Sequence, residues 1–521
     1  MSDDLPGGWA AVEFGQVVES MKNGLYKPAS SYADRGVACL RMYNIENGGI
    51  SWHNIKRMKL SPTEGREYEL APGDLLVNRV NSRELVGKAA VIPEGLEHCV
   101  FESKNIRVRL HSSAIEPRYA NYALSLWGRE HFTINSQQVV GMASISQPQI
   151  AAFRFPLAPL AEQRRIVEKV EALLEQVNRA KGRLDRVPLI LKRFRQAVLA
   201  AGCAGELTSE WRGTQRVESM ADHLRGVALQ DSAAARRLAR RSTVGLTEVS
   251  PPEDLPETWC IRSVKELVTR GAIIDFQDGN HGSLYPRATD FGEMGVRFLT
   301  AKQVFNDRVL LDEAPFLRAE TARTLRIGHA RPGDVLLTHN ATVGRVGVLP
   351  VDAPPCILGT SVTYYRLNPA VLDSRFVAYL MQSELWQSQL RTVMEQTTRN
   401  QVSVRKQAEF WLVLPPPEEQ REIARRIDDV FRLANAVEGR ITTAIDRTEN
   451  LTQAVLATAF AGELVPTEAE LARAEGRSYE TAEELLARVR SINDRDDARR
   501  PGRRARTGAN RRRTAARVPA R

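Results

Sequence analysis

Three pairs of polar stretches in this sequence carry the side chains best suited to reading the edges of nucleic acid bases. Arg can form two hydrogen bonds with guanine, and Asn or Gln can do the same with adenine. The candidate DNA-binding residues are Asn78, Arg79, Asn81 and Arg83 with Thr338, His339, Asn340 and Thr342, then Gln137 and Gln138 with Thr398, Arg399 and Asn400, then Asn23, Tyr26 and Lys27 with Gln277, Asn280 and His281. Any single one of them could instead be a turn residue that bonds to its own backbone.

Groups suited to catalysis or metal binding form no recognisable motif. The sequence contains no G-x-G-x-x-G, no G-x-x-x-x-G-K-[ST] and no H-E-x-x-H. Its five cysteines lie far apart without a C-x-x-C, and its eight histidines are scattered. We therefore predict no catalytic residue, no metal site and no cofactor bound by this chain.

The sequence segments expected to position the polar stretches occur twice in the chain. The pairs LAPLAEQRRI and LPPPEEQREI, and QAVLAAGCAGEL and QAVLATAFAGEL, lie 257 residues apart. With small gaps, LPGGW also matches LPETW, and PGDLLVN matches PGDVLLTHN. A repeat unit of about 200 residues is too long for a solenoid and indicates two duplicated domains. The frame repeats closely while the polar stretches differ, as expected if each copy reads a different sequence.

Each copy joins an α+β domain to a long helix. About 150 residues of short apolar runs, separated by Gly, Pro and Asn, are typical of strands and turns. The helix follows, with apolar residues at alternating spacings of four and three, the pattern of a heptad coiled coil. The two seams run from Ile166 to Val198 and from Ile423 to Val455. We expect them to pair with each other; the alternative is that each helix packs separately on its own domain. Pro188 predicts a kink near Leu184.

Composition places any nucleic acid affinity in local surfaces. A chain of 521 residues exceeds what one core usually serves. The formal charge is +10, but residues 499–521 hold ten arginines, and without them the chain has 63 basic and 63 acidic residues. This tail is predicted to be disordered, either as a solubilising end or as a phosphate-binding arm. No stretch has the pattern of a signal peptide or a membrane span, so we expect a cytoplasmic protein.

The two LPxxW openings, the PGD strands, the PPPEEQREI helix start and the helix end AVLATAFAGELV resemble those of specificity subunits from type I restriction-modification systems. The resemblance covers the chain to about Arg490. It implies that each copy reads one half of a bipartite, asymmetric DNA target, and that the helices set the gap and dock two methyltransferase subunits. It also implies restriction and translocase subunits as partners, with S-adenosylmethionine, ATP and Mg²⁺ bound by the partner subunits in a prokaryotic cytoplasm.

The resulting prediction is an α+β fold, with two pseudo-symmetric target recognition domains separated by an antiparallel pair of long coiled-coil helices. The predicted segments are 1–155 and 255–413 for the recognition domains, 156–205 and 414–463 for the helices, 206–254 for a linker, 464–490 for a C-terminal helix and 491–521 for the disordered tail.

Two other classes of function remain open from the residues. One is an enzyme with a concealed site, such as a nuclease in which Asp74, Glu102 and Lys104 hold Mg²⁺. The second copy weakens this alternative because it has Gly359 and Ser361 in place of Glu102 and Lys104. The other is a coiled-coil interaction protein or repressor that forms a homodimer.

Overall fold

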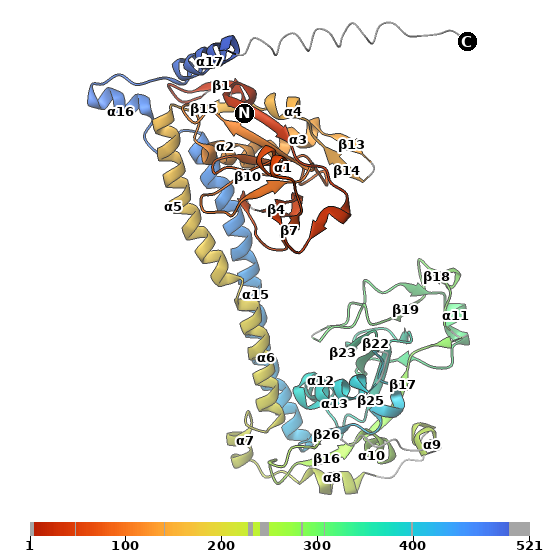
Figure 1. Ribbon diagram of the computed structural model, residues 1–521. Helices are drawn as coiled ribbons and strands as arrows, with labels where there is room; N and C mark the ends of the chain where they lie inside the picture. Colours follow the sequence, from red (N-terminus) through yellow and green to blue (C-terminus); the bar gives the residue numbers. More distant parts are fainter. Residues whose placement is uncertain are drawn as a thin grey trace, which may run out of the picture. The chain divides into compact units, whose positions relative to one another are not determined.

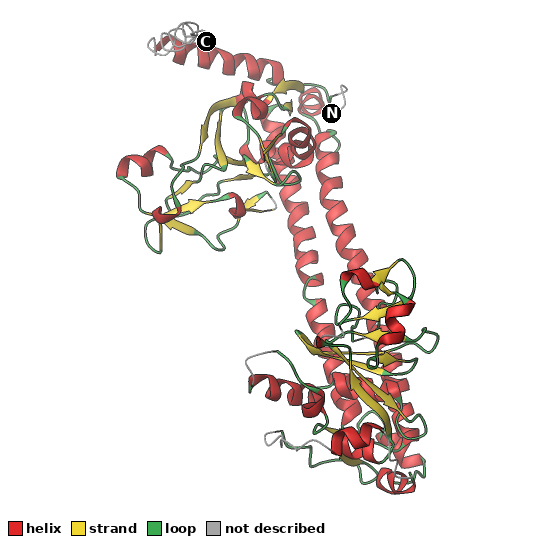
Figure 2. Ribbon diagram, turned by 90° about the vertical axis from the view of Figure 1, so that its right-hand side faces the viewer, coloured by secondary structure: helices red, strands yellow, loops and turns green. Residues whose placement is uncertain are grey.

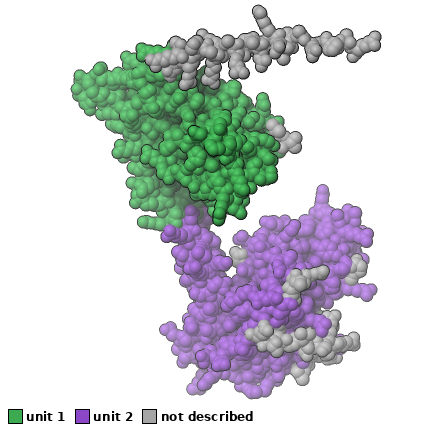
Figure 3. All heavy atoms as spheres, in the orientation of Figure 1, with its two compact units in different colours: residues 1–184, 443–521 green, residues 185–442 purple. Residues whose placement is uncertain are grey.

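The computed structural model describes residues 5–46, 48–139, 141–227, 233–239, 249–282, 285–306, 308–396 and 400–499 (Figure 1). The chain divides into two compact units (Figure 3). Unit 1 contains residues 1–184 and 443–521, and unit 2 contains residues 185–442. Each unit combines β-sheets with segments of the long helices (Figure 2).

The main sheets of the two units have the same antiparallel strand order. In unit 1 the order is β10 (Ala89–Val91), β8 (Leu75–Asn78), β12 (Asn105–Leu110) and β2 (Val18–Asn23). In unit 2 it is β23 (Thr342–Val348), β22 (Val335–Asn340), β25 (Val362–Leu367) and β17 (Ile273–Asp278). This shared order is the structural basis of the pseudo-symmetry predicted from the repeat.

Alternate residues of these strands enter different cores. In unit 1, Leu75 and Val77 join the core that faces the helices, while Leu76 joins a second core on the opposite face. Successive side chains of a strand point to opposite faces. A sheet covered on both faces therefore requires the unbroken apolar runs seen in the sequence.

Smaller elements complete each unit. Unit 1 adds the sheets β11 (Cys99–Phe101), β4 (Val37–Leu40), β7 (Lys56–Met58) and β3 (Tyr32–Ala33), then β13 (Gln137–Val139), β14 (Met142–Ser144) and β9 (Val80–Asn81), then β1 (Ala10–Glu13) with β15 (Arg154–Leu157), and the helices α2 (Pro117–Ala123), α3 (Arg129–Asn135) and α4 (Gln147–Ala151). Unit 2 adds β18 (Phe291–Gly292), β20 (Phe316–Leu317), β19 (Val296–Leu299), β24 (Cys356–Leu358) and β21 (His329–Ala330), then β16 (Cys260–Ser263) with β26 (Trp411–Leu414), and the helices α10 (Val264–Thr269), α12 (Ser374–Gln382), α13 (Glu384–Glu395) and α14 (Val404–Gln407).

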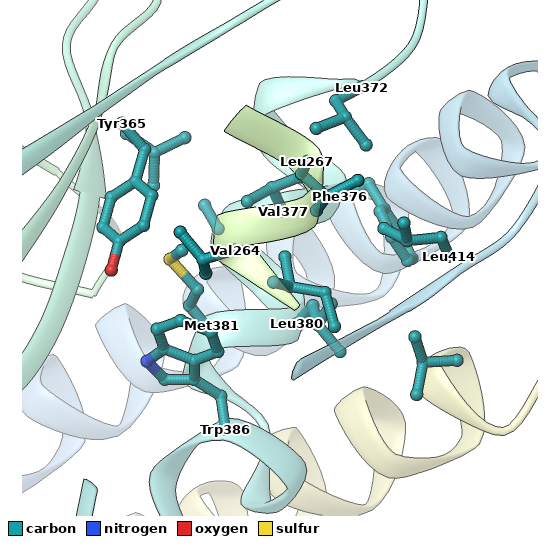
Figure 4. Close-up of a cluster of buried hydrophobic side chains, with 14 of the residues drawn as sticks. Val264, Leu267, Tyr365, Leu372, Phe376, Val377, Leu380, Met381, Trp386 and Leu414 are labelled. Carbon is teal, nitrogen blue, oxygen red and sulfur yellow. The ribbon is translucent and has the colours of Figure 1, made fainter. Parts of the chain in front are cut away.

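The core of unit 2 is built where α10, α12 and α13 meet the main sheet. Figure 4 shows Met381 beside Trp386 in this core. The Trp386 ring lies 6.2 Å from the ring of Tyr365 in β25 and 5.1 Å from that of Phe410, both in edge-on arrangements. Aromatic rings in this arrangement stabilise a core beyond the area that they bury.

The PGD motif of each copy is a structural turn. Gly73 and Gly333 adopt φ values of +85° and +83°, as predicted for a turn that needs glycine. The Asp74 carboxylate accepts a bond from the guanidinium of Arg109 at 3.0 Å, and Asp334 accepts one from Arg366 at 2.7 Å. Each aspartate therefore ties the turn to the neighbouring strand.

The Glu-Gln pair of each helix start joins three distant parts of a unit. Gln163 Oε1 accepts from the backbone N–H of Glu116 at 2.9 Å, and its Nε2 donates to the carbonyls of Ala114 and Ala158. In unit 2, Gln420 bonds in the same way to the residues at the same offset, Asp373, Val371 and Pro415. The preceding glutamate, Glu162 or Glu419, accepts a bond from the indole N–H of the Trp in the LPxxW opening, at 2.8 and 2.9 Å.

The long helices pair in antiparallel fashion within each unit. In unit 1, α5 (Leu160–Leu184) places Lys181 3.0 Å from Glu449, while Ile166, near its other end, shares a core with Phe460 of α15 (Pro417–Phe460). In unit 2, α6 (Val187–Cys203) places Arg195 2.7 Å from Glu438, while Gly202 lies against Ile423 and Ile427. The predicted pairing is confirmed, and the alternative of separate packing is wrong.

Pro188 interrupts only the first helix, as predicted. The helix α5 ends at Leu184, and α6 begins at Val187 with Pro188 in its first turn, where the missing N–H costs no helical bond. The second copy has Ile445 at the corresponding position, and α15 runs through it.

Two segments differ from the sequence prediction. The segment predicted as a linker contains α7 (Ser209–Thr214), α8 (Met220–Gly226) and α9 (Ala233–Ala239), and Met220 and Leu224, one helical turn apart, are buried in the core of unit 2. The predicted C-terminal helix is two helices, α16 (Glu468–Glu475) and α17 (Ala482–Arg499), because Gly476 ends α16 with φ +65°. Residues 491–499, predicted to be disordered, belong to α17, and residues 500–521 lie outside the described part.

Among the described residues, no helix combines the length and the apolar character needed to cross a membrane.

Candidate nucleic-acid interface

The three polar stretches of unit 1 come together at one end of its main sheet. Asn23 is the last residue of β2, and Gln147 Nε2 donates to its side-chain oxygen at 3.1 Å. The backbone N–H of Arg79, directly after β8, donates to the carbonyl of Lys104 at 2.7 Å. The hairpin of β13 and β14 extends this edge, because β14 pairs with β9 immediately after Arg79.

The corresponding stretches of unit 2 converge in the same way. The backbone N–H of His339 donates to the carbonyl of Ser361 at 3.0 Å, and the N–H of Val402 donates to the carbonyl of His339 at 2.9 Å. Asn340 and Gln401 form an antiparallel bridge. Three segments that are distant in sequence therefore form one surface in each unit, which sequence spacing alone could not establish.

Unit 1 presents most of its predicted residues to solvent. Asn23, Arg83, Gln137 and Gln138 are exposed, and Tyr26 is 82% exposed.

Two cations of unit 1 differ in their partners. Lys27 is half-buried and lies 2.6 Å from Glu64; together with bonds from Ser61, it lowers the pKa of the Glu64 carboxyl to about 2. Arg79 is half-buried and, within the described part of the chain, has no ion-pair partner. Its guanidinium is therefore available to an external anion. Because basic and acidic residues balance outside the Arg-rich tail, any attraction of an anion must come from such local cations.

Asn78 and Asn81 are structural residues rather than surface readers. Both are buried, and Asn81 Nδ2 donates to Asn78 Oδ1 at 2.7 Å. Asn78 Nδ2 in turn donates to Asn105 Oδ1 at 3.0 Å and to the carbonyl of Lys104. These amides satisfy one another and the ends of neighbouring strands, so they have no free edge to present to a base.

Unit 2 divides its predicted residues similarly. His281, Thr342 and Asn400 are exposed, and Gln277 and Asn340 are half-buried. Thr398 and Arg399 lie outside the described residues.

Three predicted residues of unit 2 are buried. Thr338 Oγ1 accepts from the backbone N–H of Arg345 at 2.9 Å, and Asn280 Nδ2 donates to the carbonyl of Ile327 at 2.9 Å. His339 Nδ1 lies 2.8 Å from Thr363 Oγ1, and burial lowers the pKa of its imidazole to about 4. These three side chains support the surface from beneath.

The groups proposed for a nuclease do not assemble. Asp74 lies at the Arg109 end of β12, whereas Glu102 and Lys104 lie at the opposite end of that strand. The Glu102 carboxylate accepts the backbone N–H of Met42 at 2.9 Å. Within the described part of the chain, no three His, Cys, Asp or Glu side chains are grouped so that they could hold a metal ion.

Sequence reasoning missed several residues of these surfaces. Gln147, Lys104 and Ser144 lie at the unit 1 edge, and Gln401 lies at the unit 2 edge. The offset of 257 residues aligns Gln401 with Ser144, so the repeat itself could have directed attention to this position. Its pairing with Asn340 depends on long-range strand contacts that the sequence does not display.

Comparisons with known proteins agree on one family. The family model for the type I restriction modification DNA specificity domain matches residues 6–188 and 329–447, more than half of the chain. The type I restriction enzyme EcoBI specificity subunit of Escherichia coli is 25% identical over 453 residues, which cover 86% of this chain and 84% of that protein. The StySPI specificity subunit of Salmonella potsdam is 28% identical over 476 residues, covering 88% and 90%.

A solved structure shares the fold. It is described as showing the structural basis underlying complex assembly and conformational transition of the type I R-M system. Its chain is 19% identical and has a TM-score of 0.62, with coverage of 89% of this chain and 100% of its own. The repeated architecture, the family match over both copies and these relatives lead to one conclusion: the chain belongs to the type I restriction-modification DNA specificity family.

Proposed function

We propose that this chain is the non-catalytic, DNA-reading subunit of a type I restriction-modification complex, and that each unit reads one half of a bipartite, asymmetric target. One observation carries the proposal. Equivalent positions at the surfaces of two matching scaffolds hold different side chains, such as Ser144 in unit 1 and Gln401 in unit 2. Two different readers on one chain suit an asymmetric site, whereas a homodimeric reader suits a palindrome.

The scaffold itself supports this division. The Gln163 and Gln420 networks repeat bond for bond between the two units. The surfaces at the strand ends do not repeat. Conservation of a frame together with variation at its loops is the arrangement expected of a scaffold that carries binding sites.

The helices would set the gap and dock two methyltransferase subunits. At 1.5 Å per residue, the 44 residues of α15 correspond to about 66 Å of helix. In unit 2 the helices also expose Leu189, Ile190 and Leu433, with 54%, 58% and 68% of their surfaces accessible. Exposed apolar side chains of this size on a helix suit contact with another protein.

The chemistry would belong to the partners. Methyltransferase subunits would bind S-adenosylmethionine, and restriction and translocase subunits would use ATP and Mg²⁺. This chain would act in the cytoplasm on double-stranded DNA.

Co-expression with methyltransferase subunits, followed by mapping of methylated adenines, tests the proposal. The expected result is two short motifs at a fixed gap, with no methylation by the purified chain alone. Replacement of residues 1–155 by another such domain should alter one motif only. A single or palindromic motif, or alteration of both halves by the replacement, would contradict the assignment of one unit to each half.

A further inference from the structure

One pair of opposed positions differs in a chemically informative way between the two units. In unit 2, Asn340 and Gln401 face each other across an antiparallel bridge. The equivalent pair in unit 1 is Val80 and Ser144, which join β9 to β14. Gln401 is exposed and Asn340 is half-buried. Within the described residues, neither carboxamide has a hydrogen-bond partner.

A buried polar ladder lies beneath this pair. His339 Nδ1 is 2.8 Å from Thr363 Oγ1, and Gln407 Nε2 donates to the same hydroxyl at 3.3 Å. Gln407 Nε2 also donates to the carbonyl of Val402 at 2.7 Å, and Gln407 Oε1 accepts from the Tyr365 hydroxyl at 2.7 Å. His339 is 2% exposed, and the side chains of Thr363, Tyr365 and Gln407 are fully buried.

The ladder fixes the orientation of the Gln407 amide. The Val402 carbonyl can only accept, so the amide nitrogen of Gln407 faces it and Thr363. Thr363 therefore accepts from Gln407. Its hydroxyl can donate to His339 Nδ1 when the imidazole carries its proton on Nε2, or accept a second bond when the proton is on Nδ1. In either case the hydroxyl links the Gln407 amide to the His339 ring.

The fold does not require this ladder. The unit 1 residues at the positions of Thr363, Tyr365 and Gln407 are Ile106, Val108 and Ile150, which are buried in an ordinary apolar core. Buried polar networks are costly unless every member is bonded, and they specify a unique geometry when they are. A unit that has such a network where its twin has aliphatic side chains uses it for something other than folding.

We propose that Asn340 and Gln401 are the specificity-determining pair of unit 2, that they recognise adenine in its half of the target, and that the ladder positions them. The His339 side chain enters the ladder, and alternate residues of a strand face opposite sides, so Asn340 faces away from the ladder. Gln401 precedes Val402, whose carbonyl is bonded to the ladder, and its side chain is exposed. A carboxamide matches adenine because it can accept from N6 and donate to N7. The inference rests on the proposed function and names the residues that carry it.

The test grafts the unit 1 residues onto unit 2. The double variant Asn340→Val with Gln401→Ser, assembled with methyltransferase subunits, is compared with the wild-type complex on targets substituted at each base of both halves. Loss of a bidentate contact should lower discrimination at one or two positions of the unit 2 half by about tenfold or more. The unit 1 half should be unaffected. The reciprocal variant Val80→Asn with Ser144→Gln is the matched control and should alter only the unit 1 half.

The ladder is tested with Thr363→Val, which keeps the shape but removes the hydroxyl. Discrimination at the same base positions should fall about three- to tenfold, and the thermal unfolding temperature of the complex should also fall because buried His339 and Gln407 lose a partner. Thr363→Ser should restore discrimination because it returns the hydroxyl. If Thr363→Ser were no better than Thr363→Val, the positioning role would be refuted.

Two failures can be told apart. An unchanged unit 2 half in the Asn340→Val and Gln401→Ser variant, with active methylation, would overturn this inference alone. A wild-type complex that did not methylate a bipartite site would overturn the proposed function together with the inference.

Discussion

Two equivalent glutamates, Glu162 in unit 1 and Glu419 in unit 2, bind different chain segments. Glu419 accepts bonds from Trp259 and also from Thr208 and Arg212, which follow the first long helix. Glu162 accepts from Trp9 and from the backbone N–H of Glu468, which follows the second long helix. The bond from the tryptophan indole is present in both units but, among the residues described, only Glu419 also accepts a bond from an arginine, Arg212.

This difference shows which part of the frame was kept after duplication. Arg212 lies 2.8 Å from Glu419, whereas in unit 1 Arg165 is bonded to Glu468 at 2.7 Å. Burial raises the pKa of Glu162 despite the bonds from Glu468 and Trp9. The bond between the Trp of the LPxxW opening and the glutamate is the same in both copies. The bonds from the segment that follows the other copy's long helix differ between the two units.

The largest expected effect tests the shared part. Gln163→Ala and Gln420→Ala should each lower the free energy of unfolding by about 3 to 5 kcal/mol, because each leaves a buried backbone N–H and buried carbonyls without partners. Chemical denaturation, with hydrogen exchange of the peptides around Glu116 and Asp373, measures the loss in each unit. A clearly unequal loss would contradict the equivalence of the two frames.

The second prediction tests the part that differs. Arg212→Ala removes the cation from a fully buried carboxylate and should cost about 3 kcal/mol. Glu162→Gln should cost about 1 to 2 kcal/mol, because the amide oxygen keeps an acceptor for Trp9 while its NH2 group replaces the acceptor of the Glu468 N–H. Thermal unfolding of both variants gives the comparison. Glu162→Gln proving the more damaging change would reverse our account of the two anchors.

The third prediction concerns pH and applies to unit 2 alone. The pKa of His339 is about 4 in the folded protein, against an ordinary value of 6.5, because burial outweighs the charge of Asp278, while His281 acts in the same direction as burial. The unfolded chain therefore binds the proton first. The stability that His339 contributes is fully present above pH 6.5 and is lost as pH falls towards 4, by roughly 3 kcal/mol in total.

Urea denaturation across this pH range measures the loss, and His339→Gln should remove that part of the pH dependence. A variant with the same pH profile as the wild-type chain would show that another group is responsible.

The smallest expected effect lies on the helix surfaces. Lys181 pairs with Glu449 in unit 1, and Arg195 pairs with Glu438 in unit 2. Both pairs are accessible to solvent, so Lys181→Ala and Arg195→Ala should each change stability by less than about 1 kcal/mol. Thermal unfolding at low and high salt would reveal any larger contribution from either pair.

Much of the frame could be predicted from the amino-acid order. The repeat, the heptad seams, the interruption at Pro188 and the glycine-containing PGD turns follow from local spacing or from the fixed offset. These features are visible in a sequence because each depends on residues within a few positions of one another, or on a copy at a constant distance.

The candidate surface required the tertiary structure. Asn78, Asn81, Asn280, Thr338 and His339 match the composition of a reading loop, yet they face the interior. Only the strand register decides which of two neighbouring residues points outward, and that register is set by partners far away in the chain.

The role of the Glu-Gln motif also depends on distant contacts, because Glu162 and Gln163 bond to Trp9 and Glu116. By itself, EQ at the start of a helix indicates only a favourable charge near the helix N-terminus. Its role as the anchor of Trp9 arises across 153 residues of chain. Local periodicity therefore determined the elements and their duplication, whereas long-range packing decided which polar groups stabilise each unit from within and which lie at its surface.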